Sequence, residues 1–498
     1  MTAPDWRVHL REGVDPASVD LGRGVTLPAL WAKQWASSPD TPVIHDAHGW
    51  TSGAQLEVRV ASATSRLLGR GLEPGDRVIV SAASTLDLVV AHVACLRAGA
   101  VVVPTNAAYG PSELEHIVLD SKPRFAIVDD AQRAEHIAAA NRTIVITTPA
   151  IDFEPGDLGA PELRAADAAL IGYTSGTTGR PKGAVLSHGN LLASVNALLM
   201  SWRWTSSDRL VLCLPLFHMH GLGVGLHGTL AAGASTVLLQ GFEPNTVLDA
   251  IAEHDATLFF GVPTMYHRLA QSSRADELSK LRLMVSGSAP MPAALHQRMF
   301  ELTGTQVLER YGMTETAMLV SNPYAGERRG GSVGIALPGV EVRLVGDPAE
   351  VQVKGPNVFG GYWNRDDATD EAFDEGWFRT GDLGSFDDDG YLTLDGRSKE
   401  LIISGGFNVY PREVEDAIRT HDLVDDVAVV GAPSDEWGEE VTAYIVGIPV
   451  SVAELKAHVG DSLAPYKRPR QVYVVDELPR NALGKVQKHR LSNGEVVP

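Results

Sequence analysis

Helix-like and strand-like segments alternate through residues 27–144, and this alternation limits the fold more than any other feature of the chain. Apolar residues recur at helical spacing through 54–68 and 86–98. Short apolar runs typical of buried strands lie at 77–83, 100–106, 125–130 and 143–147. Strands separated by helices predict a parallel, doubly wound sheet of the α/β class. Ligands of such sheets bind beyond the carboxyl ends of the strands, so we expect the functional site at that edge.

A segment rich in glycine and hydroxyl groups, YTSGTTGRPKG (173–183), directly follows another apolar run. Glycines let backbone N–H groups approach a ligand closely, Ser and Thr add hydroxyl donors, and Lys182 adds a positive charge. This composition predicts a phosphate-binding loop rather than a flexible surface turn. Its spacing is not that of an ordinary P-loop, because the lysine comes three residues after Gly179. The candidate phosphate ligands are Thr174, Ser175, Gly176, Thr177, Thr178, Gly179 and Lys182.

Composition narrows the class of protein. A chain of 498 residues exceeds one ordinary domain. The formal net charge of −20 argues against nucleic acid as a general partner. No apolar run approaches the ~20 residues of a membrane span, and the polar N-terminus does not resemble a signal peptide. Two cysteines provide neither a disulfide framework nor a metal cluster. We therefore expect a cytoplasmic protein that binds neither nucleic acid nor a membrane.

Basic residues gather near the C-terminus, and two interpretations of them stay open. They form either a solvated basic face or a patch that meets the phosphates of a ligand. The residues concerned are Lys467, Arg468, Arg470, Arg480, Lys485, Lys488 and Arg490.

Further strand-then-turn segments follow the phosphate loop at intervals suited to βα units: 212–223, 259–269, 281–291 and 307–316. The first is expected to be a strand that ends in His218 and His220. Two histidines at this spacing suggest a metal pair, but no cysteine or carboxylate lies nearby, so pocket lining is favoured. After residue 330 short strands and DDDG-type turns predict a smaller antiparallel β unit.

Taken in order, the motifs resemble those of the acyl-adenylate-forming superfamily, which includes acyl-CoA synthetases, adenylation domains and luciferases. The resemblance extends from about residue 25 to 490 through YTSGTTGRPKG, SGSAP, ERYGMTET, TGD, ISGGFNVYPREVE and PRNALGK. It implies an N-terminal domain over 1–398 that binds AMP and the acyl substrate, built of doubly wound sheets with a small β-barrel-like unit. A small, mobile α+β lid domain is expected over 399–498.

The resemblance also assigns roles to individual residues. Tyr311 is expected to stack on adenine, and Asp382 with Arg397 to bind the ribose hydroxyls. Glu315 and Thr178 are expected to hold Mg²⁺, which prefers oxygen ligands. The remaining nucleotide contacts are expected from Ser288, Ala289, Pro290, Glu309, Arg310, Gly312, Met313 and Thr314.

The implied reaction has two halves. A carboxylate attacks the α-phosphate of ATP to give an acyl-adenylate and pyrophosphate, and the thiol of CoA then displaces AMP. Lys485 is expected to stabilise the charge of the first step, together with Thr314, Glu315 and His218. The lid is expected to rotate about Lys399 for the second step, so that CoA meets Gly405, Gly406 and Phe407. Lys485 is also a candidate target of a protein acetyltransferase.

We expect a freestanding acid–CoA ligase. An adenylating enzyme that loads a carrier protein and an oxidative enzyme such as luciferase share the same motifs. A nucleotide-binding sensor without activity is disfavoured, because Lys485, Glu315 and Asp382 are all present.

The segment from 259 to 344 most resembles the malonyl-CoA synthetases, so malonate or methylmalonate is the expected acid. Such a pocket must neutralise a second carboxylate. Arg282 is the candidate cation, with His218 as its hydrogen-bond partner and Met313 limiting the depth of a pocket lined by Ser286 and Gly287. The alternative is a short- or medium-chain fatty acyl-CoA synthetase, favoured if three small residues open a longer channel: Gly221, Gly223 and Gly261.

Overall fold

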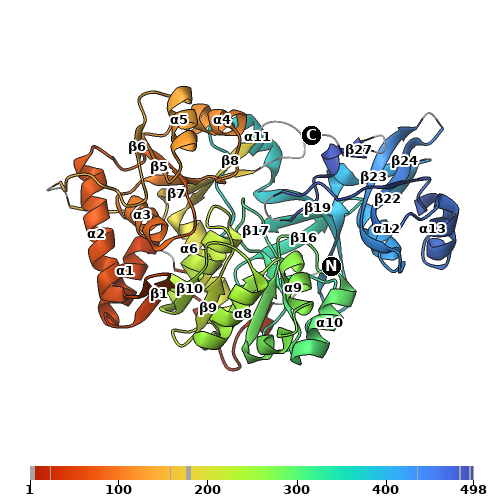
Figure 1. Cartoon of the computed structure of the whole chain (residues 1–498), viewed down its shortest axis with the longest axis horizontal. Coiled ribbons are helices and arrows are strands. Elements are labelled where there is room, and N and C mark those ends of the chain that lie inside the picture. Colours follow the sequence, from red (N-terminus) through yellow and green to blue (C-terminus); the bar gives the residue numbers. More distant parts are fainter. Residues whose placement is uncertain are drawn as a thin grey trace. The chain divides into compact units, whose positions relative to one another are not determined.

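The computed structural model describes residues 6–22, 24–156, 159–174, 181–434, 436–481, 484–492 and 495–496. The chain forms two compact units, one of residues 1–341 and 353–378 and the other of 342–352 and 379–498. Both contain helices and strands (Figure 1), which confirms the α/β class. The boundary expected at 398/399 marks the residue about which the lid domain is expected to rotate. It is not the division between these two compact units, and it stays a prediction.

The first unit contains a six-stranded sheet in the order β6-β5-β3-β4-β7-β8. All neighbours pair in parallel except β8, which is antiparallel to β7. Ser52 and Thr85 cap the first turns of helices α2 and α3 with their side chains. The strands are β3 (Arg77–Ser81), β4 (Val101–Pro104), β5 (Phe125–Val128), β6 (Val145–Thr147), β7 (Ala168–Thr174) and β8 (Lys182–Ser187), and the helices are α2 (Gly53–Gly69), α3 (Leu86–Arg97), α4 (Pro111–Ser121) and α5 (Ala131–Ala140). The alternation expected from the sequence is confirmed.

A nine-stranded sheet, ordered β15-β14-β13-β12-β11-β9-β10-β1-β2, makes up the rest of this unit. Its strands are β1 (Pro42–Asp46), β2 (Gly49–Ser52), β9 (Arg209–Leu212), β10 (Ser235–Leu238), β11 (Leu258–Gly261), β12 (Leu283–Ser286), β13 (Leu308–Tyr311), β14 (Val320–Ser321) and β15 (Ile335–Ala336). Its helices are α1 (Leu27–Ser37), α6 (His188–Ser201), α7 (His227–Ala232), α8 (Pro244–Glu253), α9 (Pro263–Ala270) and α10 (Ala293–Thr303). Apolar residues of α8, α9 and α10 pack against the central strands in one core. Residues 353–378 add α11 (Asp366–Ala372) and β18 (Phe373–Asp374).

One strand is shorter than the sequence predicts. We expected a strand running to His218 and His220, but β9 ends at Leu212 and a π-helix forms over His220–Leu226. Pro215 interrupts the segment between them, and proline cannot donate to a strand ladder. A Cβ at Gly221 would lie 2.3 Å from the Pro215 carbonyl oxygen, so glycine is what lets the π-helix begin against this segment.

The second unit holds an antiparallel β unit, as expected, followed by a small α+β region. The strands that lie wholly or mostly in this unit are β16 (Glu341–Val345), β17 (Glu350–Lys354), β19 (Trp377–Phe386), β20 (Leu392–Arg397), β21 (Ile402–Ser404), β22 (Phe407–Val409), β23 (Val424–Ser434), β24 (Gly438–Gly447), β25 (Gln471–Val474), β26 (Leu491–Ser492) and β27 (Glu495–Val496). Helices α12 (Pro411–Ile418) and α13 (Val452–His458) pack on β23 and β24 through a core of their own. Within the described residues, no helix is both long and apolar enough to cross a membrane.

Candidate active site

The candidate residues of the first unit gather where strands end. Thr174 is the last residue of β7, Ser286 that of β12 and Tyr311 that of β13. In a doubly wound sheet these carboxyl ends are where ligands bind. The structure therefore places these residues at the carboxyl ends of strands in two sheets, β7 in the six-stranded sheet and β12 and β13 in the nine-stranded sheet.

The phosphate loop is anchored at both flanks, although Ser175, Gly176, Thr177, Thr178 and Gly179 lie outside the described residues. The Thr174 hydroxyl donates to the Lys182 carbonyl at 3.4 Å. Thr314 lies against the strand that leads into the loop, because a Cβ at Gly172 would be 2.3 Å from its Cγ2. Thr314 therefore lies beside β7, and its contact with phosphate stays a prediction.

Glu315, the expected Mg²⁺ ligand, is buried. Tyr362 donates its hydroxyl hydrogen to Glu315 Oε1 at 3.0 Å, and the Phe359 N–H donates to the Glu315 carbonyl at 2.8 Å. The described residues contain no group of three or more His, Cys, Asp or Glu that could hold a metal ion alone. One carboxylate with a neighbouring hydroxyl at Thr314 suits Mg²⁺, which takes few protein oxygens and completes its shell with phosphates and water.

Glu309 has a structural task. Its carboxylate accepts the Met291 N–H at 3.0 Å and the Gly331 N–H at 3.2 Å. Its side chain therefore braces the loop that carries Ala289 and Pro290. The adenine contacts expected from these two residues and from Tyr311, Gly312 and Met313 remain predictions.

Arg310 occupies an unusual environment for a guanidinium group. The residue is only 5% exposed, and its Nε and Nη2 have no hydrogen-bond partner among the described residues. A Cβ at Gly287 would lie 2.3 Å from Arg310 Cζ, so this glycine makes room for the guanidinium. Burial lowers the pKa of Arg310 to about 9, which leaves it charged at neutral pH. An unpaired buried cation at the ligand-binding edge points to an anionic ligand.

Two histidines lie close to this cation. Burial, followed by the charge of Arg310, lowers the pKa of His218 to about 4 and that of His220 well below 6.5, so both are neutral. The backbone N–H of His220 donates to His218 Nδ1 at 3.3 Å, which leaves the ring proton of His218 on Nε2. Ser288 Oγ lies 3.3 Å from His220 Nδ1, and Ser288 adopts a left-handed φ of 69°. Arg310 therefore supplies a single positive charge next to neutral donors.

Arg282, the cation that the sequence suggested for the second carboxylate, is a wrong assignment. Its Nε and Nη2 form a two-point ion pair with Asp208 at 2.6 Å each. Nη1 also donates to the Trp202 carbonyl at 3.1 Å. Arg282 precedes β12, so it lies at the amino end of the strand, about 16 Å of extended chain from Gly287. Its expected partner His218 lies near Arg310 instead.

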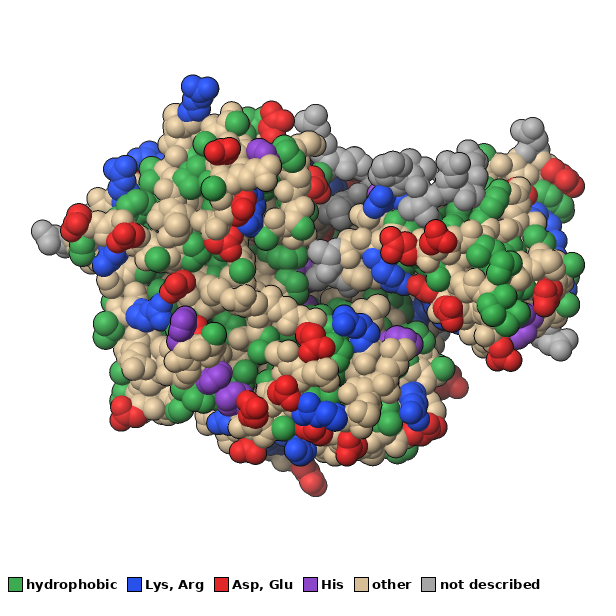
Figure 2. All heavy atoms as spheres, viewed as in Figure 1, with side chains coloured by type: hydrophobic (Ala, Val, Ile, Leu, Met, Phe, Trp, Pro, Cys, Tyr) green, Lys and Arg blue, Asp and Glu red, His purple; other side chains and the backbone are tan. Residues whose placement is uncertain are grey.

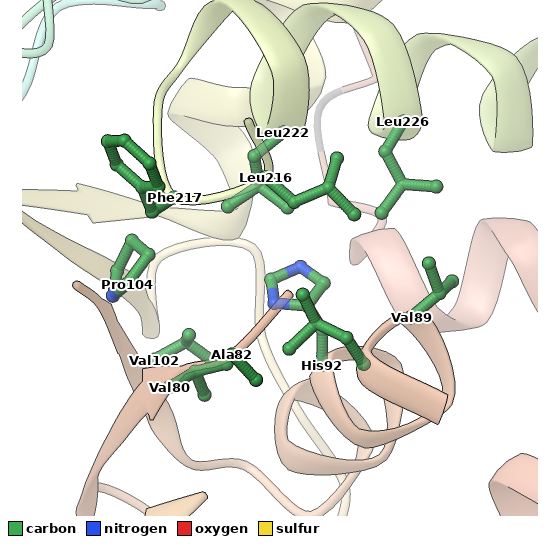
Figure 3. A pocket seen from close by; sticks show the side chains of 11 residues that line it. Val80, Ala82, Val89, His92, Val102, Pro104, Leu216, Phe217, Leu222 and Leu226 are labelled. Atoms are coloured by element: carbon green, nitrogen blue, oxygen red, sulfur yellow. The ribbon is translucent and has the colours of Figure 1, made fainter. Parts of the chain in front are cut away.

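An apolar pocket lies beside the segment that carries His218. Figure 3 shows Leu216, Phe217 and Leu222 on one side of it and His92 pointing into it. His92 Nε2 is 2.9 Å from His227 Nε2, and burial lowers the pKa of His92 to about 3, so its ring is neutral. With no charged residue in its lining, this pocket is unsuited to a carboxylate.

The second unit brings together its own set of candidates. Asp382 and Arg397 face each other across β19 and β20, with Arg397 Nε 3.0 Å from Asp382 Oδ1. Lys485 is exposed as a residue, yet burial of its ammonium is the largest cause that lowers its pKa, and Arg397 adds to this effect. Glu400 and Asp382 oppose the shift. The expected ribose pair and the expected catalytic lysine are therefore neighbours.

The expected CoA-binding turn and hinge are also well defined. Gly405 and Gly406 have φ values of 59° and 82° and join β21 to β22 as a two-residue hairpin, a geometry that favours glycine at both positions. Phe407 is exposed and stacks on Tyr466 at 4.6 Å between ring centroids. Lys399 is exposed in a short turn between β20 and β21. Their roles toward CoA and lid rotation stay predictions.

Several of the C-terminal basic residues have acidic partners. Lys467 pairs with Glu413 at 2.6 Å, Lys488 pairs with Glu415 at 2.7 Å, and Arg480 pairs with Asp426. On the face shown in Figure 2, basic and acidic side chains are interspersed on each unit. The solvated-face interpretation fits these pairs better than a phosphate-binding patch does.

Known proteins resemble this chain over most of its length. The AMP-binding enzyme family matches residues 31–363, and the AMP-binding enzyme C-terminal domain matches residues 413–485. A feruloyl-CoA synthase of Amycolatopsis sp is 37% identical over 462 residues, which cover 89% of this chain and 94% of that protein. The mitochondrial malonate–CoA ligase of Mus musculus is 36% identical over 482 residues, covering 85% and 83%. The crystal structure of ATP-bound MatB from Rhodopseudomonas palustris has a TM-score of 0.88 at 39% identity, covering 93% of this chain and 98% of that one.

Proposed function

The chain belongs to the AMP-binding enzyme family and is an AMP-forming acyl-CoA synthetase; we propose that the acid it activates is malonate or methylmalonate. The observation that carries this proposal is the buried, unpaired guanidinium of Arg310 beside His218 and His220. The resemblance to malonyl-CoA synthetases agrees with this proposal, and so does the name of the malonate–CoA ligase relative. The name of the feruloyl-CoA synthase relative does not.

The charge balance favours a dicarboxylate. One carboxylate of the acid is consumed when it attacks the α-phosphate of ATP, so only the second must be neutralised throughout the reaction. Arg310 offers two N–H groups without partners, and a carboxylate can accept from both at once. His218, with its proton on Nε2, provides a neutral donor at the same place. Without such an anion the guanidinium stays buried and unpaired, at a cost of several kcal/mol.

Acids without a second charge suit this pocket less well. A ferulate ring or an alkyl chain would leave Arg310 unpaired and would add an apolar group against it. The glycines that were expected to open a longer channel are instead closely packed. A Cβ at Gly221 would lie 2.3 Å from the Pro215 carbonyl, and one at Gly223 would lie 2.3 Å from Met219 Cε. The fatty-acid alternative therefore loses the observation that favoured it.

The other candidate residues have consistent places in this reaction. Lys182 and Thr314, at the phosphate loop, donate to the triphosphate, and Lys485 stabilises the charge that grows on the α-phosphate. Glu315 would hold Mg²⁺, which would neutralise further phosphate charge. Asp382 and Arg397 hold the ribose. After adenylation the lid turns at Lys399, and the Gly405–Gly406 turn lines the path of the CoA thiol.

A substitution with a matched control tests the pocket. Arg310→Met removes the buried cation, whereas Arg268→Met removes an exposed arginine of α9 that lies over Phe242. Steady-state pyrophosphate release would be measured with malonate, methylmalonate, butyrate, octanoate and ferulate. We expect the native protein and R268M to prefer malonate over butyrate and octanoate by about 10³ in kcat/KM. We expect R310M to lose this preference.

Two results would contradict the proposal. Octanoate or ferulate turned over as efficiently as malonate by the native protein would exclude the dicarboxylate pocket. An R310M protein that kept its preference for malonate would show that another residue supplies the cation.

A further inference from the structure

Tyr362 lies between two charged groups that belong to different parts of the site. Its hydroxyl donates to Glu315 Oε1 at 3.0 Å. The ammonium of Lys182, at the end of the phosphate loop, lies over its ring at 4.6 Å from the centroid. A single side chain therefore contacts both the lysine that follows the loop and the carboxylate suited to Mg²⁺.

The backbone around Tyr362 fixes the position of its ring. The Tyr362 N–H donates to Thr369 Oγ1 at 2.9 Å, and the following N–H, of Trp363, donates to the Gly183 carbonyl at 2.7 Å. The Phe359 ring packs on its edge at 4.9 Å between centroids. The hydrogen bond of Trp363 to Gly183 ties this segment to strand β8 at the residue that follows Lys182. Tyr362 therefore has little freedom to follow the Glu315 side chain if that side chain moves.

The chemistry of the two contacts is complementary. The phenol O–H of Tyr362 donates to the Glu315 carboxylate, which accepts through Oε1. A hydrogen bond to an ionised acceptor is stronger than one between neutral groups. The ring face attracts the lysine ammonium through its quadrupole.

We propose that Tyr362 is a positioning residue that sets the Glu315 carboxylate for Mg²⁺ and holds Lys182 toward the phosphates of ATP. The inference rests on the proposed reaction only for the use of Mg²⁺–ATP, and not for the identity of the acid. Loss of the hydroxyl should weaken the metal-dependent part of ATP binding alone. Loss of the ring should also weaken the part that Lys182 contributes.

Calorimetric titration of ATP into the full chain, without any acid substrate, separates these contributions. Each protein is titrated once with EDTA and once with saturating Mg²⁺. The variants are Tyr362→Phe, which keeps the ring, Tyr362→Leu, which removes it, and Tyr473→Phe as a control that removes the phenol hydroxyl of a tyrosine on β25, where it donates to Gln471. Thermal melting of each variant reports any general loss of stability.

We expect Y362F to bind ATP in EDTA like the native protein, while Mg²⁺ tightens its binding by about 10-fold less. Y362L should in addition bind ATP about 3-fold more weakly in EDTA. Y473F should match the native protein in both titrations. The inference is overturned if Y362F responds to Mg²⁺ like the native protein, if Y473F reproduces the Y362F result, or if Mg²⁺ has no effect on native ATP affinity. Failure of malonate as substrate would leave all of these results unchanged.

Discussion

Mild acid should destabilise this protein through histidines that packing keeps neutral. Burial is the main cause that lowers the pKa of each member of this group, to about 4 for His9 and His188 and to about 3 for His92. The group consists of His9, His92, His188, His218, His220 and His227. In the unfolded chain each binds a proton near pH 6.5. The folded state does not, so stability falls as pH drops from above 6.5 toward 4.

The size of the effect follows from the number of groups. Between pH 7.5 and 5.5 one such histidine loses about 1.4 kcal/mol of stability, so six lose about 8 kcal/mol if they act independently. Folded domains are stable by only about 5–15 kcal/mol. All six histidines belong to the first unit. We therefore expect the first unit to lose a large part of its stability between pH 7.5 and 5.5.

Urea unfolding followed by circular dichroism at pH 7.5, 6.5 and 5.5 measures this loss. The His9→Gln variant removes one of these six histidines; the Nε2 of His9 lies 3.2 Å from the Ile335 carbonyl oxygen. The His48→Gln variant removes an exposed histidine and serves as the control. We expect H9Q to lose about 1.4 kcal/mol less than the native protein over this pH range, and H48Q to lose the same amount as the native protein. Stability that changes by less than about 1 kcal/mol between pH 7.5 and 5.5 would refute the reasoning.

Two further predictions concern the reaction. Lys485→Ala should lower the rate of acyl-adenylate formation by about 10² or more while sparing thioester formation from preformed acyl-adenylate. Single-turnover assays of the two half-reactions measure this difference, and equal losses in both would contradict the prediction. Gly287→Ala should displace the Arg310 guanidinium, because the added Cβ would lie 2.3 Å from Cζ, and so raise the KM for malonate with little change in the KM for ATP. A G287A protein with an unchanged KM for malonate would show that the guanidinium does not touch the acid.

Local patterns in the sequence were sufficient for much of the fold and for part of the site. The alternation of helices and strands predicted the doubly wound sheets, because burial on both faces leaves continuous apolar runs. The Gly405–Gly406 turn was predictable from two adjacent residues whose conformation requires glycine. Thr174, Thr314 and Glu315 lie in motifs short enough to be identified without knowledge of the tertiary structure.

The remaining site residues depend on contacts between distant segments. Arg282 and Arg310 are both arginines of β segments in the sequence, and only the structure shows that Asp208 neutralises the first while the second is unpaired. Tyr362 was not among the expected residues, since 47 positions separate it from the Glu315 that it contacts. The π-helix over His220–Leu226 begins where Gly221 closely approaches Pro215, a contact that no helical or strand periodicity reveals.

A competition experiment tests the central claim most directly. The native protein would be given ATP, Mg²⁺ and a limiting amount of CoA with equal concentrations of malonate, octanoate and ferulate, and the thioesters would be identified by mass spectrometry. Because competing acids are consumed in proportion to their kcat/KM, a pocket built around the Arg310 cation predicts malonyl-CoA as the dominant product, with AMP formed in equal amount. Octanoyl-CoA or feruloyl-CoA as the main product would contradict the account.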